Sequence, residues 1–118
     1  MLRTIDRVFG SLMILGCIGH TLGTMKFYAA MSDVWVWSLG TSLAGFLLGA
    51  TNLLRASRLN DKPLAAITLT GTAAFAFVAI GFGRSIHNMA DPRGVGNLII
   101  ATALVALSAR SLTERVTR

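Results

Sequence analysis

The chain has 118 residues, of which 53% are hydrophobic and only 14% charged, and its formal net charge is +6. Soluble domains carry about 25% charged residues, so this composition excludes an ordinary soluble domain, and the apolar content excludes a disordered chain. The positive charge does not indicate nucleic-acid binding, because the basic residues cluster at the ends of apolar runs and are not interleaved with stacking aromatic residues.

Four long runs of the chain contain no charged residue, and they are 18, 21, 21 and 16 residues long. Because a bilayer core of about 30 Å needs about 20 helical residues to cross it, each run is typical of a transmembrane helix. Short loops make neighbouring helices antiparallel. The sequence therefore predicts one integral membrane domain, 1–118, an all-α, four-helix transmembrane bundle with up-down-up-down topology. The runs are Val8–Met25, Val34–Leu54, Pro63–Gly83 and Gly94–Ala109, and the predicted helices cover about 8–30, 33–55, 62–86 and 92–111.

The first predicted helix carries a stripe of glycines around a histidine. His20 follows Gly16 by four residues and precedes Gly23 by three, so it shares their helix face, with Gly19 beside it. Ionisable residues inside a membrane are costly and are candidates for function. Three interpretations of His20 stay open: a hydrogen bond between helices, contact with a ligand, and a proton relay or metal ligand.

The second predicted helix starts at an N-cap, Ser32 or Asp33, and carries the clearest packing stripe of the chain. Small residues at spacings of 4, 3, 4 and 3 lie on one face and let helix backbones approach closely in lipid. We expect this face to contact another helix, either in this chain or in a second copy. The stripe consists of Ser38, Ser42, Gly45, Gly49 and Asn52.

The third and fourth predicted helices also begin with capping signals. Asn60 or Asp61 precedes Pro63, and Asp91 precedes Pro92; proline is tolerated in a first turn because its missing donor is not needed there. In the fourth helix one stripe combines polar and apolar residues at spacings of 4, 3 and 4, which indicates a second contact face. This stripe is Asn97, Ala101, Leu104 and Ser108.

The basic residues predict the orientation of the bundle. Eight Lys and Arg residues lie at one side of the predicted bundle and three at the other, and basic residues favour the cytoplasmic side. Both termini and the connection between the second and third helices are therefore expected in the cytoplasm. The eight are Arg3, Arg7, Arg55, Arg58, Lys62, Arg110, Arg115 and Arg118, and the three are Lys26, Arg84 and Arg93.

No catalytic constellation is recognisable, and no acidic residue lies in any of the four runs. Small multidrug resistance exporters match the chain in length and helix number but depend on a membrane glutamate in their first helix, so the pattern argues against proton-coupled cation export. A haem or copper site through His20 is an alternative, with Cys17 three residues before it as a soft ligand. For a haem held by two histidines, His87 is predicted at a different depth from His20. No cofactor is predicted.

The stretch Gly19-His20-Thr21-Leu22-Gly23-Thr24 resembles that of small uncharacterised bacterial membrane proteins with a Gly-His motif in the first of four helices. This resemblance implies a four-helix protein of the bacterial inner membrane and implies no activity.

The leading functional hypothesis is a non-catalytic membrane protein that binds or carries a small apolar molecule or a lipid. Its site is predicted beside His20, between the first and second helices. The alternatives are a structural subunit or homo-oligomer that packs through glycine and serine faces, and a redox protein that binds haem or copper. The expected partners are membrane lipid and a second copy of the chain, with no nucleic acid. The predicted ligand-binding residues are His20, Ser38, Ser42 and Asn97, and the predicted helix-packing residues are Gly16, Gly19, Gly23, Gly45, Gly49 and Asn52.

Overall fold

The computed structural model describes residues 1–58 and 60–114, and within them the protein folds as a bundle of four α-helices. Each helix is long and apolar enough to cross a membrane. The prediction of an all-α, four-helix transmembrane bundle is therefore confirmed, and the protein is a multi-pass membrane protein. The helices are α1 (Leu2–Phe27), α2 (Asp33–Ser57), α3 (Lys62–Ser85) and α4 (Pro92–Thr113).

Side-chain caps start three of the helices, as the sequence predicts. The Ser32 hydroxyl accepts a hydrogen bond from the Trp35 amide, and Asp61 accepts one from the Leu64 amide. At α4 the Asp91 carboxylate accepts from the amide of Arg93. Each cap satisfies an amide that the first turn of a helix leaves without an internal partner.

The Asp91 cap is also an ion pair at the membrane surface, because the Arg93 guanidinium donates to the same carboxylate at 2.9 Å. These hydrogen bonds from the Arg93 side chain and amide lower the pKa of Asp91 to about 2. The carboxylate is therefore ionised at any physiological pH and caps α4 throughout that range.

The ends of α1 differ from the predicted span of about 8–30. The helix begins at Leu2 and ends at Phe27, where Tyr28 turns to extended backbone. The predicted start followed the charge-free run, whereas the helix begins earlier and includes the charged residues Arg3, Asp6 and Arg7. It does so because two of these charges reach solvent and the third is buried against protein. The predicted spans of α2 and α4 already included Arg55 and Arg110, and these helices end two residues later than predicted, at Ser57 and Thr113.

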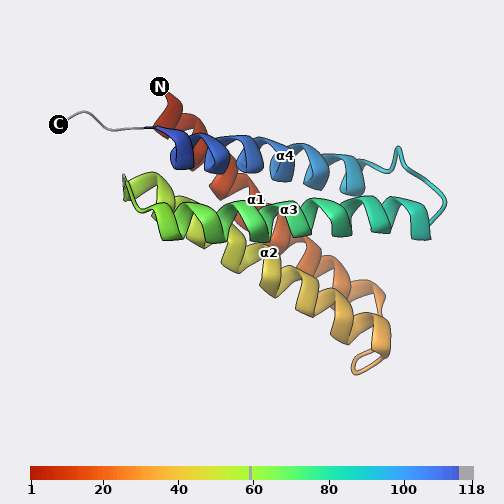
Figure 1. Cartoon of the computed structure of the whole chain (residues 1–118). Helices are drawn as coiled ribbons and strands as arrows, with labels where there is room; N and C mark the ends of the chain where they lie inside the picture. Colours follow the sequence, from red (N-terminus) through yellow and green to blue (C-terminus); the bar gives the residue numbers. More distant parts are fainter. Residues whose placement is uncertain (59, 115–118) are drawn as a thin grey trace.

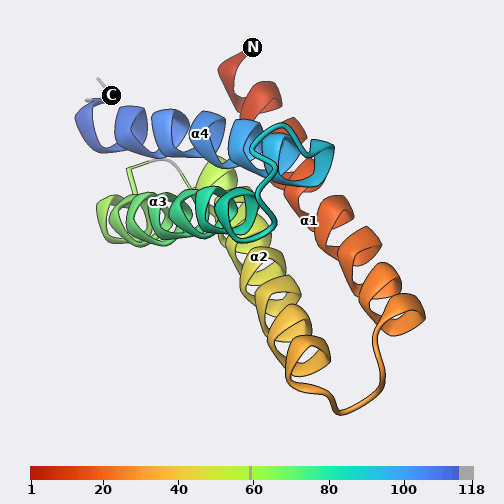
Figure 2. The same cartoon turned by 90° about the vertical axis from the view of Figure 1, so that its right-hand side faces the viewer.

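The helices form two antiparallel hairpins, α1–α2 and α3–α4, that cross each other at an angle (Figures 1 and 2). The hairpins meet at the end that holds the start of α1, the end of α4 and the connection between α2 and α3; we call this the closed end. They diverge toward the end that holds the connections 28–32 and 86–91, which we call the open end.

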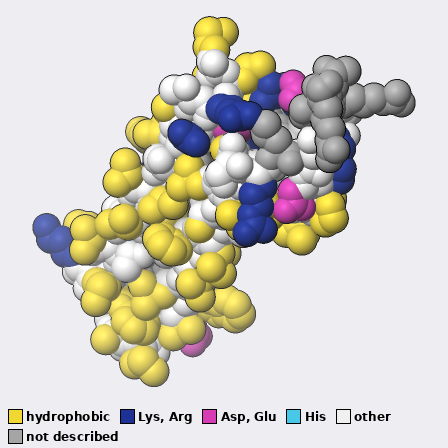
Figure 3. Space-filling model, turned by 90° about the vertical axis from the view of Figure 1, so that its left-hand side faces the viewer, with side chains coloured by type: hydrophobic (Ala, Val, Ile, Leu, Met, Phe, Trp, Pro, Cys, Tyr) yellow, Lys and Arg dark blue, Asp and Glu magenta, His cyan; other side chains and the backbone are white. Residues whose placement is uncertain are grey.

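The apolar core is small and lies where the two hairpins cross. Met13 and Cys17 from α1 pack with Phe75 from α3, and three α4 residues complete the cluster. Most large hydrophobic side chains face outward instead, for example Phe77 and Leu15, which are 75% and 63% exposed. An outward apolar surface is what a bilayer requires, and Figure 3 shows it on one face of the molecule. The α4 residues of the core are Ala101, Leu104 and Leu107.

Candidate functional site

An apolar groove lies between α1 and α2, on the part of this hairpin that leads toward the open end. Its volume is about 320 Å³, which is at the lower end of the range of volumes found for small-molecule sites. The walls are almost entirely aliphatic and aromatic, apart from the hydroxyl-bearing residues of the two helices. The residues that shape it are Ile18, Leu22, Leu39, Leu43 and Phe46, with Ser42 as a polar residue in the wall.

Ser42 links the groove to His20. The Ser42 hydroxyl oxygen lies 2.7 Å from Nδ1 of His20, which makes this the polar contact between the two helices of the hairpin in this region. Ser42 is buried, whereas the His20 ring is exposed at the outer surface of the bundle. The second polar wall residue, Thr21, donates its hydroxyl to the Cys17 carbonyl within α1. Of the two hydroxyl groups in the groove wall, that of Ser42 is therefore the one that links α1 to α2.

The other two predicted ligand-binding residues lie apart from this groove. Ser38 is half-buried one turn before Ser42 on α2. Asn97 is on α4, where its side-chain amide donates to the Arg93 carbonyl at 2.8 Å, and its oxygen lies near Gly16 of α1. The structure thus brings His20 and Ser42 together and places Asn97 on the opposite hairpin. A ligand-binding role for these residues stays a prediction.

The glycine stripe of α2 is the contact face with α1. A Cβ atom at Gly49 would lie 2.7 Å from Cγ1 of Ile14 and 3.0 Å from the backbone oxygen of Gly10. A Cβ atom at Gly45 would collide with the Cys17 sulfur, and Phe75 of α3 packs on the same position. The Gly45–Gly49 face is therefore filled within the chain.

The glycines of α1 behave differently from those of α2. Gly19 and Gly23 have open space where a Cβ atom would stand, and only the Asn97 oxygen lies near such an atom at Gly16. The α1 glycine that contacts α2 is Gly10, which faces Leu53 and the Gly49 carbonyl.

A buried ion pair between Asp6 and Arg55 is the strongest polar feature of the bundle. The Arg55 guanidinium of α2 donates to both oxygens of the Asp6 carboxylate of α1, and their side chains are only 2% and 4% exposed. The same guanidinium donates to the Ser111 hydroxyl at 2.6 Å and to the Leu107 carbonyl at 3.2 Å, both on α4. Arg55 therefore joins three helices at the closed end.

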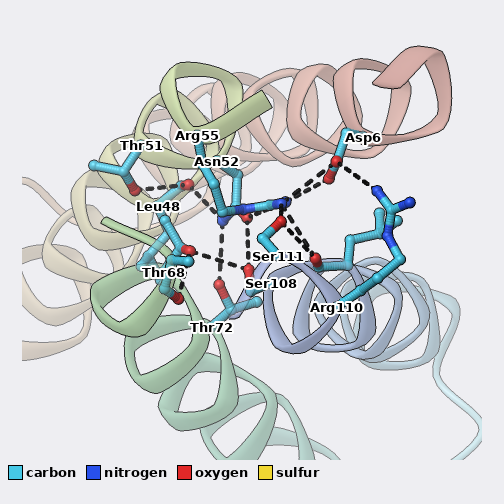
Figure 4. A network of polar contacts seen from close by, with 12 residues as sticks. Asp6, Leu48, Thr51, Asn52, Arg55, Thr68, Thr72, Ser108, Arg110 and Ser111 are labelled. Carbon is cyan, nitrogen blue, oxygen red and sulfur yellow. Dashed lines mark hydrogen bonds and ion pairs between the residues drawn. The ribbon is translucent and has the colours of Figure 1, made fainter. Parts of the chain in front are cut away.

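A second polar residue, Asn52, extends this network to all four helices (Figure 4). Its amide nitrogen donates to the Thr72 hydroxyl of α3, and its oxygen accepts from Arg55 and from Ser108 of α4. Ser108 also lies 3.0 Å from the Thr68 hydroxyl. Each of these polar side chains is fully buried, so their mutual hydrogen bonds offset the cost of removing them from water.

The network reaches the surface through Arg110, whose guanidinium lies 3.8 Å from Asp6 and pairs with Glu114 at 3.0 Å. Beside it, the Lys62 ammonium of α3 donates to three carbonyl groups at the end of α4, those of Ser111, Leu112 and Glu114. A lysine is well suited to the carbonyls that end a helix without internal partners.

No protein-family model matches the chain, and neither a curated protein nor a solved structure is significantly similar to it. The assignment of a function therefore rests on the residues and their geometry.

Asp6 is an acidic residue of α1 that lies outside the charge-free runs. The charge-free run contains no acidic residue, but α1 extends beyond that run and includes a buried carboxylate. This carboxylate is bound to Arg55 and lies close to Arg110, so it differs from an unpaired membrane glutamate. The network could have been found by extending the α2 stripe one step past Asn52, which reaches Arg55, and by following the buried face of α1 back from Met13 through Gly10 to Asp6.

For the alternative of a metal or haem site, the described residues do not bring a set of ligand side chains together. In residues 1–58 and 60–114 no three His, Cys, Asp or Glu side chains lie together. Cys17 is buried against α2 and α3, while His20 bonds Ser42 at the surface. His87 lies beyond the end of α3 with a positive φ of 53°, in the connection at the open end.

Proposed function

We propose that this chain is a non-catalytic membrane protein that binds or carries a small apolar molecule or a lipid chain in the α1–α2 groove. The observation that carries the proposal is the groove itself, with its apolar walls and the Ser42 hydroxyl set among them. A few placed polar groups in a mostly apolar recess are typical of small-molecule sites.

The His20–Ser42 pair would orient such a ligand. Ser42 has one contact with His20 Nδ1 and is otherwise free of hydrogen bonds to side chains among the described residues, and His20 Nε2 has no partner there. Both groups lie in a region surrounded by hydrocarbon, where a polar atom gains more from a hydrogen bond than it does in water. A ligand with an apolar body and one polar group is therefore the class that this groove fits best.

The groove can be tested by filling it. Leu43 lines it, whereas Leu47, one turn later on α2, does not, and the two leucines are similarly exposed at 60% and 54%. We expect Leu43→Trp to lose the small molecule or lipid that co-purifies with the protein, because the indole occupies the recess. Leu47→Trp should retain it. Mass spectrometry of extracts from protein purified in mild detergent measures both, and equal retention by the two variants would refute the proposal.

We further propose that the protein lies in a bacterial inner membrane with both termini in the cytoplasm. The proposal is supported by the distribution of basic residues, eight against three, and by an arrangement in which the start of α1, the end of α4 and the α2–α3 connection share the closed end. The resemblance of the Gly19–Thr24 stretch to bacterial four-helix proteins points to the same membrane.

The orientation predicts the behaviour of reporter fusions. A green fluorescent protein fused after Arg118, which lies outside the described residues, should fluoresce, because this reporter folds on the cytoplasmic side. An alkaline phosphatase inserted in the connection 86–91 should be active, because that connection is at the open end. The reverse result at both sites would overturn the topology.

A further inference from the structure

Arg3 and Arg7 form a pair of exposed cations at a place where the chain itself disfavours positive charge. They are four residues apart in the first two turns of α1, so both project from the same side of the helix. Like charges at this spacing repel each other. The amino end of a helix carries the positive end of the helix dipole, which also disfavours cations, and the first turn contains no acidic residue.

The acidic residues at the closed end are already engaged by other groups. Asp6 binds Arg55 and lies close to Arg110, and Asp61 accepts from the Leu64 amide as the cap of α3. Glu114 pairs with Arg110. Within residues 1–58 and 60–114, neither Arg3 nor Arg7 has a hydrogen bond or an ion pair from its side chain. Among the described residues the charge of these two arginines is therefore left available to an external anion.

The neighbouring surface identifies the anion as part of a lipid. Toward the middle of α1, Arg3 and Arg7 are followed on or near their side by the exposed Ser11 and then by apolar residues: Leu15, Ile18 and Leu22 are 63%, 47% and 64% exposed. Arginine at the edge of an apolar band lies at the depth of the phosphate groups, and its guanidinium binds phosphate through two parallel hydrogen bonds. Figure 3 shows Lys and Arg side chains gathered at the closed end beside apolar surface.

We propose that Arg3 and Arg7 form a binding site for the headgroup of an anionic phospholipid at the closed end, whose acyl chains lie along the outer face of α1. The two arginines lie outside the α1–α2 groove, whereas Ile18 and Leu22 on the acyl-chain path also belong to the wall of that groove. Lys26 and Arg84, in the last turns of α1 and α3, provide the contrast: their charges lie where the helix dipole favours them and need no external anion.

The site is tested by native mass spectrometry of the detergent-purified full chain with equimolar phosphatidylglycerol and phosphatidylcholine. Wild type should prefer phosphatidylglycerol, and Arg3→Gln/Arg7→Gln should lose about fivefold of that preference per arginine. Arg3→Lys/Arg7→Lys should keep most of it, and the matched control Arg84→Gln should keep all of it. Because these side chains are exposed, every variant should retain the wild-type melting temperature.

Three results would overturn the proposal. The first is equal binding of the two lipids by wild type, and the second is an unchanged preference in the Arg3→Gln/Arg7→Gln variant. The third is complete displacement of phosphatidylglycerol by millimolar inorganic phosphate, which would show a site for free phosphate. We expect the Arg3→Gln/Arg7→Gln variant to retain the same groove ligand as the wild type. The Leu43→Trp variant should keep its preference for phosphatidylglycerol.

Discussion

Asp6→Asn is expected to lower the free energy of unfolding by about 3–5 kcal/mol, because it removes the carboxylate that balances a buried arginine. The Arg55 and Asp6 side chains are 2% and 4% exposed, so water cannot replace the lost charge. Arg110, at 3.8 Å from the same carboxylate, would lose its buried counter-charge as well. The remaining hydrogen bonds of Arg55 to the Ser111 hydroxyl and the Leu107 carbonyl come from one guanidinium nitrogen and do not neutralise its charge.

Unfolding by sodium dodecyl sulfate in mixed micelles measures this effect. Glu114→Gln is the matched control, since Glu114 binds Arg110 at the surface with a side chain that is 51% exposed, and such pairs contribute at most about 1 kcal/mol. The double variant Asp6→Leu/Arg55→Met should recover much of the loss, because replacing both buried charges by apolar side chains is often neutral. If Asp6→Asn and Glu114→Gln cost the same, the ion pair does not hold the bundle together.

Gly49→Leu is expected to destabilise the α1–α2 hairpin by about 1–3 kcal/mol or more, because the added atoms have no space. A Cβ atom at this position would lie 3.0 Å from the Gly10 carbonyl oxygen and 3.3 Å from the Ile14 amide nitrogen. Both are backbone atoms, so a side-chain rotation cannot relieve the collision and the two helices must move apart. Their separation would also weaken the contact between Asp6 and Arg55 at the closed end.

Gly40 on the same helix provides the control, because no atom lies within 4 Å of its Cβ position. Gly40→Leu should be neutral or stabilising by up to about 1 kcal/mol, since leucine favours the helix over glycine. Thermal unfolding in detergent distinguishes the two substitutions. Equal melting temperatures for Gly49→Leu and Gly40→Leu would contradict the close packing of α1 on α2.

Much of the fold was predictable because it follows from local chemistry. Charge-free runs of about 20 residues indicate helices that cross a bilayer, and Ser32, Asp61 and Asp91 cap three of them in the predicted places. The small-residue stripe of α2 likewise becomes a contact face, with Ser42, Gly45, Gly49 and Asn52 buried. These features depend on residues within one or two turns of each other.

The candidate site was predictable only in part. A groove lies between the first two helices, and His20 contacts its wall through the hydrogen bond with Ser42, while ligand binding there stays a prediction. The position of Asn97 on the other hairpin depends on how the two hairpins cross, which no pattern within one helix specifies.

The sequence by itself determined the number of helices, the capped starts of α2, α3 and α4 and the face by which α2 packs, because helix periodicity, capping and hydropathy act over a few residues. Only the tertiary structure decided that Asp6 and Arg55, which are 49 residues apart, form a buried ion pair inside a network of four helices. The physical reason is that a charged residue near the end of an apolar run has two favourable environments, the headgroup region and a partner of opposite charge. The packing of the other helices decides between them, and it leaves Arg3 and Arg7 at the surface while it buries Asp6.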